Sequence, residues 1–152
     1  MKNNKITSCI IKTKIGNFQI IIDNGYLTKA YPCNLKENIF SDSELIFIKN
    51  DINKYLDGKK KTFSMKVKPE GSKFQKIVWK EIKKIKYEKT KSYLELAKKL
   101  GTSPRAIGNA CSKNKCLLFI PCHRVIRTDK TLGGFLMGEN IKKKLLTLEK
   151  GF

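Results

Sequence analysis

The sequence predicts an α/β protein in which an antiparallel sheet comes first and helices follow. β-Branched residues alternate loosely over residues 5–31, with turn candidates at residues 15–17 and 23–25, which is typical of a two- or three-stranded meander. Beyond residue 72, apolar residues recur at helical spacing instead. Hydrophobic residues make up 40% of the 152-residue chain, enough for one sizeable domain or two small ones packed together.

A helix and a short strand complete the first half of the chain. Residues 41–58 carry an apolar stripe at helical spacing, with Ser41 or Ser43 as the expected N-cap and Gly58 as the stop. The stripe consists of Leu45, Ile48, Ile52 and Leu56. Residues 59–71 then predict one more short strand and a linker.

The Pro-Glu-Gly stretch at residues 69–71 marks the predicted domain boundary. It divides the chain into a sheet-and-helix domain, residues 1–68, and a mostly helical domain, residues 69–152. The second domain begins with a helix within residues 72–85. The apolar positions of this helix are Phe74, Ile77, Val78, Ile82 and Ile85, and Trp79 is also expected in the core.

The next segment has the spacing of a helix-turn-helix motif. Ser92 and Glu95 form a capping box, and Gly101 is a helix stop. Ser103 is then an N-cap, followed by Pro104 at the first helical position. Many helical hairpins that do not bind DNA share this spacing, so it indicates DNA binding without establishing it.

The second of these helices has small residues where a major-groove reader would present long polar ones. Ala106, Gly108 and Ala110 alternate along it, and Arg105 stands at its start. A slim helix suits close approach to the minor groove, with the arginine reaching further in. Equally, Ala106 and Ala110 can simply pack against the preceding helix, and the spacing leaves both interpretations open.

The last third of the chain is predicted as an extended segment, a loop and a helix. Residues 113–126 are apolar and extended up to Pro121, which places Cys122 at the end of a buried segment. Residues 127–138 form a glycine-rich surface loop. Residues 139–152 form a closing helix, whose inward residues are Ile141, Leu145 and Leu148.

The formal net charge of +20 attracts polyanions, of which nucleic acid is the commonest. The alternative is that abundant Lys, Asn and Ile merely reflect an AT-rich genome. There is no apolar run long enough to span a membrane, and the N-terminus does not resemble a signal peptide. We therefore expect no membrane partner and a protein that stays inside the cell.

The five cysteines are odd in number and include no closely spaced CxxC pair. They are expected to be free thiols in a reducing compartment. His123 is the sole imidazole of the chain, so a zinc site is not expected, nor is any other metal or cofactor. The cysteines are Cys9, Cys33, Cys111, Cys116 and Cys122.

Cys122 and His123 lie side by side in "IPCHRV", residues 120–125. An imidazole near a thiol favours the nucleophilic thiolate. Neighbouring residues of an extended chain point to opposite faces, so the pair would need a turn or a bridging water. An acid would have to hold the imidazole, and Asp129, Glu139 and Glu149 follow it. The residues alone equally allow an inert buried thiol and a structural histidine.

"IPCHRV" resembles the alkyl-acceptor motif of the O6-alkylguanine-DNA alkyltransferases, which repair DNA by direct reversal. Residues 70–97 and 103–114 resemble the entry to the family's C-terminal domain and its recognition helix with an asparagine hinge. "LGGF" and "KKKLLTLE" resemble its closing segment. The likeness covers about residues 55–152 in family order. It implies an N-terminal RNase H-like domain and a C-terminal helix-turn-helix domain of winged-helix-like type.

The resemblance also implies an activity. The alkyl group of O6-alkylguanine, and more weakly of O4-alkylthymine, is transferred irreversibly to Cys122 after minor-groove binding and base flipping. Because the product is a thioether, each molecule reacts once as a stoichiometric cysteine S-methyltransferase. The expected partner is double-stranded DNA containing O6-alkylguanine. The protein is expected to be a monomer in the cytoplasm, associated with the nucleoid if prokaryotic.

Four residues correspond to the reacting groups of the family. Cys122 is similar to the acceptor thiol, and His123 resembles the base that deprotonates it through a water. Glu149 resembles the carboxylate that orients the histidine. Tyr93 resembles the tyrosine that crowds the target phosphate and donates a proton to the departing guanine.

Five further residues correspond to the DNA- and base-binding positions. Arg105 resembles the arginine that fills the gap left by the flipped nucleotide, and Ala106 and Gly108 belong to the helix that enters the minor groove. Asn114 matches the hinge asparagine. The carbonyl of Val125, with that of Cys122, matches the groups that hold the guanine amino group.

The chain departs from the common family pattern in two places. Lys115 follows the hinge asparagine where many relatives have proline, and Phe135 stands where a tyrosine is common. Both bear on the shape of the pocket and on which alkyl groups it accepts. Cys111 and Cys116 are expected to be bystander thiols, with oxidation to Cys122 as the alternative. A lesion-binding protein without transfer activity and a Cys–His hydrolase are the competing functions.

Overall fold

The computed structural model describes residues 4–38 and 40–150. Three antiparallel strands, β1 (Ile6–Thr13), β2 (Gly16–Asp23) and β3 (Tyr26–Cys33), form one sheet in chain order. The turn between β2 and β3 uses Asn24 and Gly25 with φ of 50° and 83°, the left-handed geometry that suits a two-residue hairpin. The predicted meander is confirmed in its three-stranded form.

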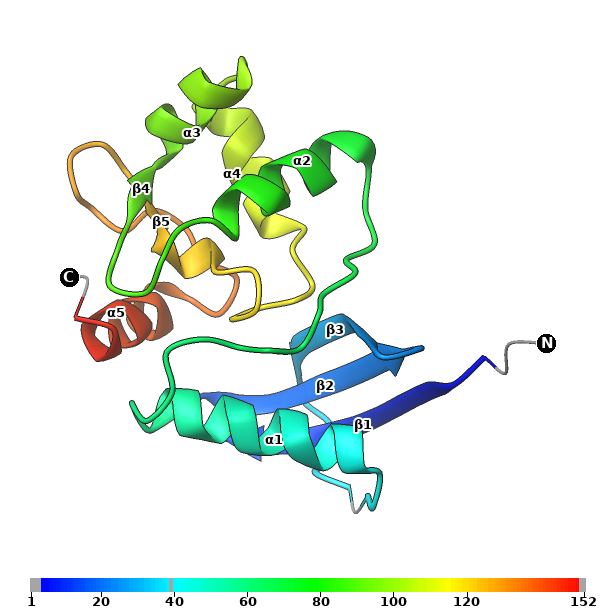
Figure 1. Cartoon of the computed structure of the whole chain (residues 1–152). Helices are drawn as coiled ribbons and strands as arrows, with labels where there is room; N and C mark the ends of the chain where they lie inside the picture. The colour runs from blue at the N-terminus through cyan, green and yellow to red at the C-terminus, as the bar shows by residue number, and fades with distance from the viewer. Residues whose placement is uncertain (1–3, 39, 151–152) are drawn as a thin grey trace.

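Helix α1 (Ser43–Leu56) covers one face of this sheet (Figure 1). Its predicted apolar stripe is buried, but neither predicted serine caps it. Asp42 does, accepting hydrogen bonds from the backbone N–H groups of Glu44 and Leu45. A carboxylate serves both orphan donors and also suits the positive end of the helix dipole.

The short strand predicted within residues 59–71 is wrong. Only Val67 forms a bridge, parallel to Leu27 of β3. Leu27 accepts from the N–H of Lys68 and donates to the carbonyl of Lys66, at 2.9 and 2.8 Å. Pro69 follows immediately and has no N–H to continue the ladder.

The second half consists of short helices and a two-stranded parallel sheet. Trp79, on α2, is buried, packs over Gly71 and donates its indole N–H to the carbonyl of Ala110 at 2.8 Å. Phe74 and Ile77 are exposed although they fit the helical stripe, because α2 buries the face of Val78, Trp79 and Ile82. The elements are α2 (Lys73–Ile82), β4 (Lys91–Ser92), α3 (Tyr93–Leu100), α4 (Pro104–Ser112), the 3-10 helix η1 (Cys122–Arg124), β5 (Val125–Ile126) and α5 (Glu139–Leu148).

The cap signals between α3 and α4 lie where the sequence predicts them. Ser92 and Glu95 form the capping box, and Gly101 ends α3 with φ of 68°. The Ser103 side chain accepts from the N–H of Ala106, and Pro104 is the first residue of α4. Two helices joined by a three-residue turn therefore pack against each other, as Figure 1 shows.

The segment before Pro121 is buried as predicted but is not extended. Leu118 has φ of 72°, and the chain turns back so that the N–H of Ile120 donates to the carbonyl of Cys116 at 2.9 Å. The turn sends Leu117, Leu118 and Phe119 into the core that the sheet shares with α1. A second core lies among α2, α3 and α4.

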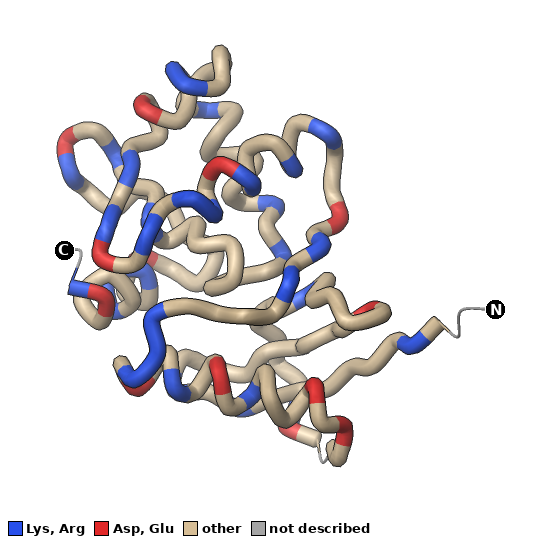
Figure 2. Tube along the Cα trace, in the orientation of Figure 1, with Lys and Arg blue, Asp and Glu red and all other residues tan. Residues whose placement is uncertain are grey.

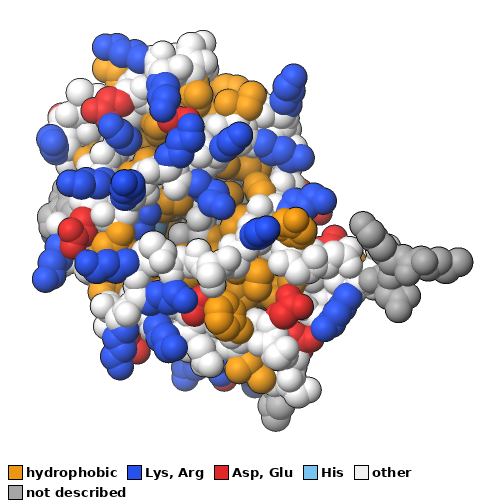
Figure 3. Space-filling model, viewed as in Figure 1, with side chains coloured by type: hydrophobic (Ala, Val, Ile, Leu, Met, Phe, Trp, Pro, Cys, Tyr) orange, Lys and Arg blue, Asp and Glu red, His pale blue; other side chains and the backbone are white. Residues whose placement is uncertain are grey.

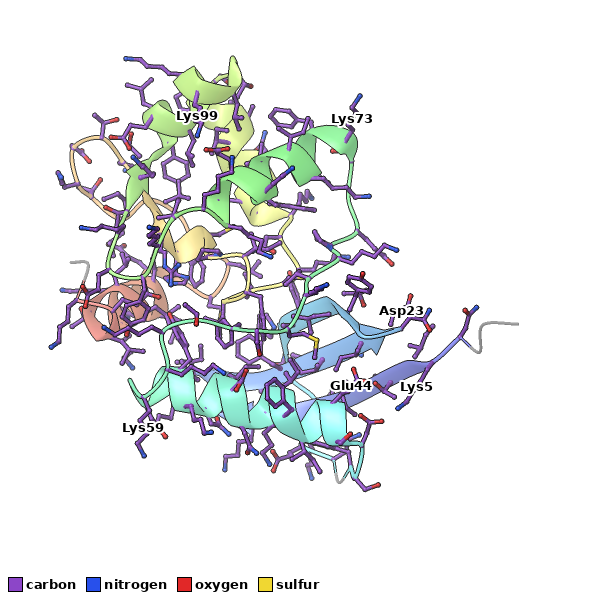
Figure 4. The ribbon with its side chains drawn as sticks, in the orientation of Figure 1. Lys5, Asp23, Glu44, Lys59, Lys73 and Lys99 are labelled. Atoms are coloured by element: carbon purple, nitrogen blue, oxygen red, sulfur yellow. The ribbon has the colours of Figure 1, made fainter. Side chains whose placement is uncertain are left out.

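Within the described residues, no helix is both long and apolar enough to cross a membrane. Figure 2 shows Lys and Arg distributed along most elements of the second half and the segment that leads into it. The space-filling view carries many basic side chains and few acidic ones on the visible face (Figure 3). Lys73 and Lys99, labelled in Figure 4, lie at the outer edge of the second half.

Candidate active site

A cavity of about 700 Å³ lies where α3, α4 and the loop after β5 meet. Tyr93, Arg105, Gly108 and Cys122 line it, so the structure brings together four of the predicted site residues. Gly133 and Phe135 contribute from the glycine-rich loop. The cavity can accept an aromatic ring, since it is largely apolar and large enough for one.

Cys122 lies at the first position of η1, and Asn114 holds it there. The Asn114 side-chain amide donates to the sulfur of Cys122 at 3.2 Å and to the carbonyl of Ile120 at 3.0 Å. Its carbonyl oxygen accepts from the N–H of Cys116 at 2.8 Å. Asn114 is 1% exposed, so a single buried side chain ties the end of α4 to the segment that carries the thiol.

The hinge that contains Lys115 is pinned to the edge of the sheet. The carbonyl of Lys115 accepts from the N–H of Ala30 at 2.8 Å, and Leu117 donates to the carbonyl of Ala30 at 3.0 Å. These bonds fix the backbone on both sides of Cys116. Pairing with β3 therefore constrains the hinge next to Asn114.

The thiol of Cys122 is held in its protonated form. The neighbouring Cys111 side chain and burial raise the pKa of Cys122, and Asn114 and Lys142 only partly offset them. Cys111 lines the same cavity, on α4. A nucleophile in this state needs a base to remove its proton.

Behind the thiol lies a buried ionic cluster. His123 Nε2 is 2.8 Å from Glu149 Oε2, and both side chains are almost completely buried. Arg124 donates to both carboxylate oxygens at 2.8 and 2.9 Å and to the carbonyl of Ile85 at 2.7 Å. The hydroxyl of Tyr55 also donates to Glu149 Oε2. Of the three acids considered from the sequence, Glu149 is the one that contacts the histidine.

The protonation states follow from these contacts. Burial alone would raise the pKa of Glu149, but hydrogen bonds from His123, Arg124 and Tyr55 outweigh it and lower the pKa to about 2. Burial lowers the pKa of His123, and Glu149 opposes this shift. A neutral imidazole beside an ionised carboxylate carries its proton on Nε2. Nδ1, buried and without a hydrogen-bond partner among the described residues, is thereby the ring's proton acceptor.

Tyr93 lines the same cavity as Cys122. Its hydroxyl is 3.5 Å from the carbonyl of Gly134 and 3.4 Å from the ammonium of Lys142. Burial raises the pKa of Tyr93 to about 12, so the phenol keeps its proton at neutral pH. It can therefore act as a donor to a group in the cavity.

Lys142 was missed by the sequence analysis, which placed only apolar residues on the inner face of α5. It is 0% exposed and donates to the carbonyls of Val125 and Gly134 at 2.7 and 3.1 Å. Burial lowers the pKa of Lys142 to about 8. Its position three residues before Leu145 and seven before Glu149 is the signal that places all three on one helix face.

The DNA-binding candidates on α4 differ in exposure. Arg105 is exposed, and Ala106 and Gly108 are half-buried, with open space where a Gly108 side chain would lie. Ala110 is buried against Trp79. Ala110 therefore packs in the core as one interpretation predicts, and the minor-groove interpretation of Ala106 and Gly108 stays a prediction. The carbonyl of Val125 accepts from Lys142 and has a second lone pair for another donor.

The described ranges contain no group of three or more His, Cys, Asp or Glu side chains placed to hold a metal ion. The chemistry that this arrangement supports is nucleophilic attack by the sulfur of Cys122, with a buried base next to it in the chain and a proton donor in the lining of the same cavity.

Residues 73–151 match the model of a protein family described as 6-O-methylguanine DNA methyltransferase, DNA binding domain. A methylated-DNA–protein-cysteine methyltransferase of Sulfolobus acidocaldarius is 42% identical over 118 residues, which cover 77% of this chain and 76% of that one. The structure is also similar to O6-methylguanine methyltransferase of Mycobacterium tuberculosis, with a TM-score of 0.80, 28% identity and coverage of 96% and 93%. The OGT of the same bacterium in complex with DNA has a TM-score of 0.82, 31% identity and coverage of 93% and 91%.

Proposed function

The chain belongs to the O6-methylguanine DNA methyltransferase family, and on this basis we propose that it repairs DNA by transferring an alkyl group from O6 of guanine to Cys122. The observation that carries the proposal is the position of a protonated thiol between a base-sized cavity and a buried His–Glu pair. O4-alkylthymine is a weaker substrate of the same chemistry.

The side chains around the cavity account for each proton and bond of the proposed reaction. The thiol proton passes through a water to Nδ1 of His123, and the resulting imidazolium is stabilised by Glu149. The thiolate attacks the alkyl carbon, so a sulfur–carbon bond forms as the carbon–oxygen bond to guanine breaks. Tyr93 donates a proton to the departing guanine, and Lys142, which is within 3.4 Å of the phenol oxygen, supports the negative charge that this leaves.

The product is a thioether, which thiol exchange does not reverse. Cys122 is consumed, and each molecule completes one turnover. In this proposal the protein acts as a stoichiometric methylated-DNA–protein-cysteine S-methyltransferase and needs no cofactor.

We propose that the substrate is double-stranded DNA, whose alkylated base must flip out of the stack to reach a cavity lined by residues of α3 and α4. We propose that α3 and α4 act as a helix-turn-helix, with Ala106 and Gly108 of α4 against the minor groove. Arg105 fills the gap in the stack, and the carbonyls of Cys122 and Val125 hold the guanine amino group.

The sheet and α1, within residues 1–68, form an RNase H-like domain in this proposal, and residues 69–152 form the winged-helix-like domain that carries the reaction. The protein acts as a monomer in the cytoplasm, on nucleoid DNA in a prokaryote. The shared core formed by Leu117, Leu118 and Phe119 with the sheet supports a structural role for the first domain.

Intact-protein mass spectrometry after incubation with a duplex containing O6-methylguanine tests the proposal. The wild-type chain is expected to gain one methyl group and no more, and Cys122→Ser none. Cys111→Ser is the matched control, because it removes the other thiol of the same cavity, and it should still be methylated. An unchanged wild-type mass with tight binding to the lesion would support a lesion-binding function instead, and turnover of small esters would support a hydrolase.

A further inference from the structure

The hydroxyl of Tyr55 connects α1 to the ionic cluster behind Cys122. Tyr55 lies in the last turn of α1, 94 positions from Glu149 in the chain, and is 1% exposed. Its hydroxyl donates to Glu149 Oε2 and lies 3.3 Å from Nε2 of His123. Figure 1 shows this end of α1 below α5. A residue of the sheet-and-helix half therefore contacts both the candidate base and the carboxylate that holds it.

We propose that Tyr55 is a positioning residue for the alkyl transfer, which fixes the tautomer and the orientation of His123 from the N-terminal half of the molecule. The inference rests on the proposed function of Cys122 and His123. It gives the first half of the chain a part in the chemistry, in addition to its packing.

The hydrogen-bond geometry allows one assignment of protons. A hydroxyl has a single proton, and the ionised carboxylate of Glu149 takes it. The oxygen lone pairs of Tyr55 then face Nε2 of His123, so that the N–H lies between Glu149 Oε2 at 2.8 Å and the phenol oxygen at 3.3 Å. Flipping the ring would lose both acceptors, so Nδ1 stays on the side away from the carboxylate.

Tyr55 remains a donor throughout the working pH range. Burial and the neighbouring charge of Glu149 raise the pKa of its hydroxyl far above the ordinary value. The donor also disperses the charge of the carboxylate, which already accepts from Arg124. Glu149 thereby interacts less strongly with a protonated imidazole than it would without Tyr55.

Packing holds the ring independently of the hydroxyl. The ring centroid of Tyr55 is 5.2 Å from that of Phe63 and 6.3 Å from that of Tyr87, the latter in an edge-to-face arrangement. Tyr55→Phe therefore removes one hydroxyl without emptying the core. Tyr87→Phe is the matched control, since its hydroxyl lies 3.4 Å from the carbonyl of Leu148 and makes no hydrogen bond to His123 or Glu149 in the described residues.

Two measurements test the proposal, and the first needs no DNA. Because His123 is the only histidine of the chain, its NMR signals report its pKa and tautomer without assignment by mutation. In Tyr55→Phe the pKa of His123 should be higher than in the wild-type protein, because the carboxylate is less well satisfied. In Tyr87→Phe it should be unchanged.

The second measurement is the single-turnover rate of methyl transfer from an O6-methylguanine duplex. Tyr55→Phe should react about tenfold more slowly, a fraction of the ~10²–10⁴-fold that a positioned general base contributes. Its affinity for unmodified duplex should match the wild type, and Tyr87→Phe should react within about twofold of it.

The proposal would be overturned by an unchanged histidine titration in Tyr55→Phe, or by equal effects of the two tyrosine variants. A lower melting temperature with wild-type titration and rate would assign Tyr55 a packing role only. If the wild-type protein transferred no methyl group, the proposed function would fail, yet the histidine titration would still decide whether Tyr55 controls His123.

Discussion

The surroundings of Cys122 differ on its two sides: a buried ionic cluster forms the rear side, and an open cavity forms the front side. Behind it, Tyr55, His123, Arg124 and Glu149 are buried, and their charges are matched by short hydrogen bonds. In front of it lies an open cavity whose walls include exposed Arg105 and a glycine-rich loop. The rear side can hold one protonation state because its dipoles and charges cannot rearrange, while the front side can exchange its solvent for a substrate. Mutations on the two sides should therefore affect different quantities.

The largest effect on stability and on methyl transfer is expected for a substitution of Glu149, at the centre of the buried ionic cluster. Glu149→Gln leaves the buried guanidinium of Arg124 without its counter-charge, so the free energy of unfolding should fall by about 3–5 kcal/mol. Methyl transfer by the folded fraction should slow by about 100-fold or more, because the imidazolium loses its stabilising partner. Urea denaturation and single-turnover kinetics measure the two losses, and a variant as stable as the wild type would show that the charge of Glu149 contributes nothing net.

Lowering the pH should gradually remove the contribution of the Glu149 carboxylate to the free energy of unfolding. The pKa of Glu149 is about 2 in the folded protein and ordinarily 4.5, so its stabilisation is complete above pH 4.5 and is lost as the pH falls through 2. The difference in unfolding free energy between the wild type and Glu149→Gln should shrink by about 3 kcal/mol between pH 6 and pH 2. A constant difference across this range would mean that the carboxylate does not titrate as its contacts require.

On the front side, Arg105→Ala should leave stability unchanged, because the side chain is exposed. Methyl transfer from duplex DNA should slow by about tenfold, while reaction with free O6-methylguanine should not change, since only the duplex requires base flipping. Lys73→Ala, which removes one positive charge at the start of α2, controls for a general loss of charge. Equal losses on duplex and free base would exclude the stack-filling role of Arg105.

The smallest effect concerns the loop that faces Tyr93. Gly133 has φ of 72°, and a Cβ there would lie 3.0 Å from the Tyr93 ring, whereas a Cβ on Gly134 would meet nothing within 4 Å. Gly133→Ala should therefore lower stability by about 1 kcal/mol and slow transfer several-fold by displacing the ring. Gly134→Ala should do neither. Thermal unfolding and transfer rates of the pair decide this, and equal behaviour of the two variants would contradict it.

The regular elements were predictable because their signals are local. The capping box of Ser92 and Glu95, the stop at Gly101 and the turn at Asn24–Gly25 each depend on a few neighbouring residues. The predictions were wrong in segments whose conformation depends on contacts with residues far away in the chain. The segment before Pro121 bends at Leu118 because its apolar side chains reach the core of the sheet, and only Val67 of its segment pairs with β3.

Some residues of the site were indicated by the sequence, and others became apparent only in the structure. The motif around Cys122 and the family likeness identified the acceptor thiol, His123, Glu149 and Tyr93 as candidates. The structure joins His123 to Glu149 by a hydrogen bond and places Cys122 and Tyr93 in the lining of one cavity. No motif indicated Lys142 or Tyr55, although the spacing of Lys142 places it on the inner face of α5. A buried lysine in an apolar stripe and a tyrosine at a helix end have ordinary helical spacing, and their polar atoms acquire a role only from partners elsewhere in the chain.

The sequence by itself determined the order of the α-helices, the basic character of the chain and the chemistry available at Cys122 and His123, since these depend on residue types and short spacings. The tertiary structure decided which ring nitrogen of His123 can accept a proton and that α1 contributes Tyr55 to the site. Those outcomes depend on burial and on hydrogen bonds between residues up to 94 positions apart, and no local pattern encodes them.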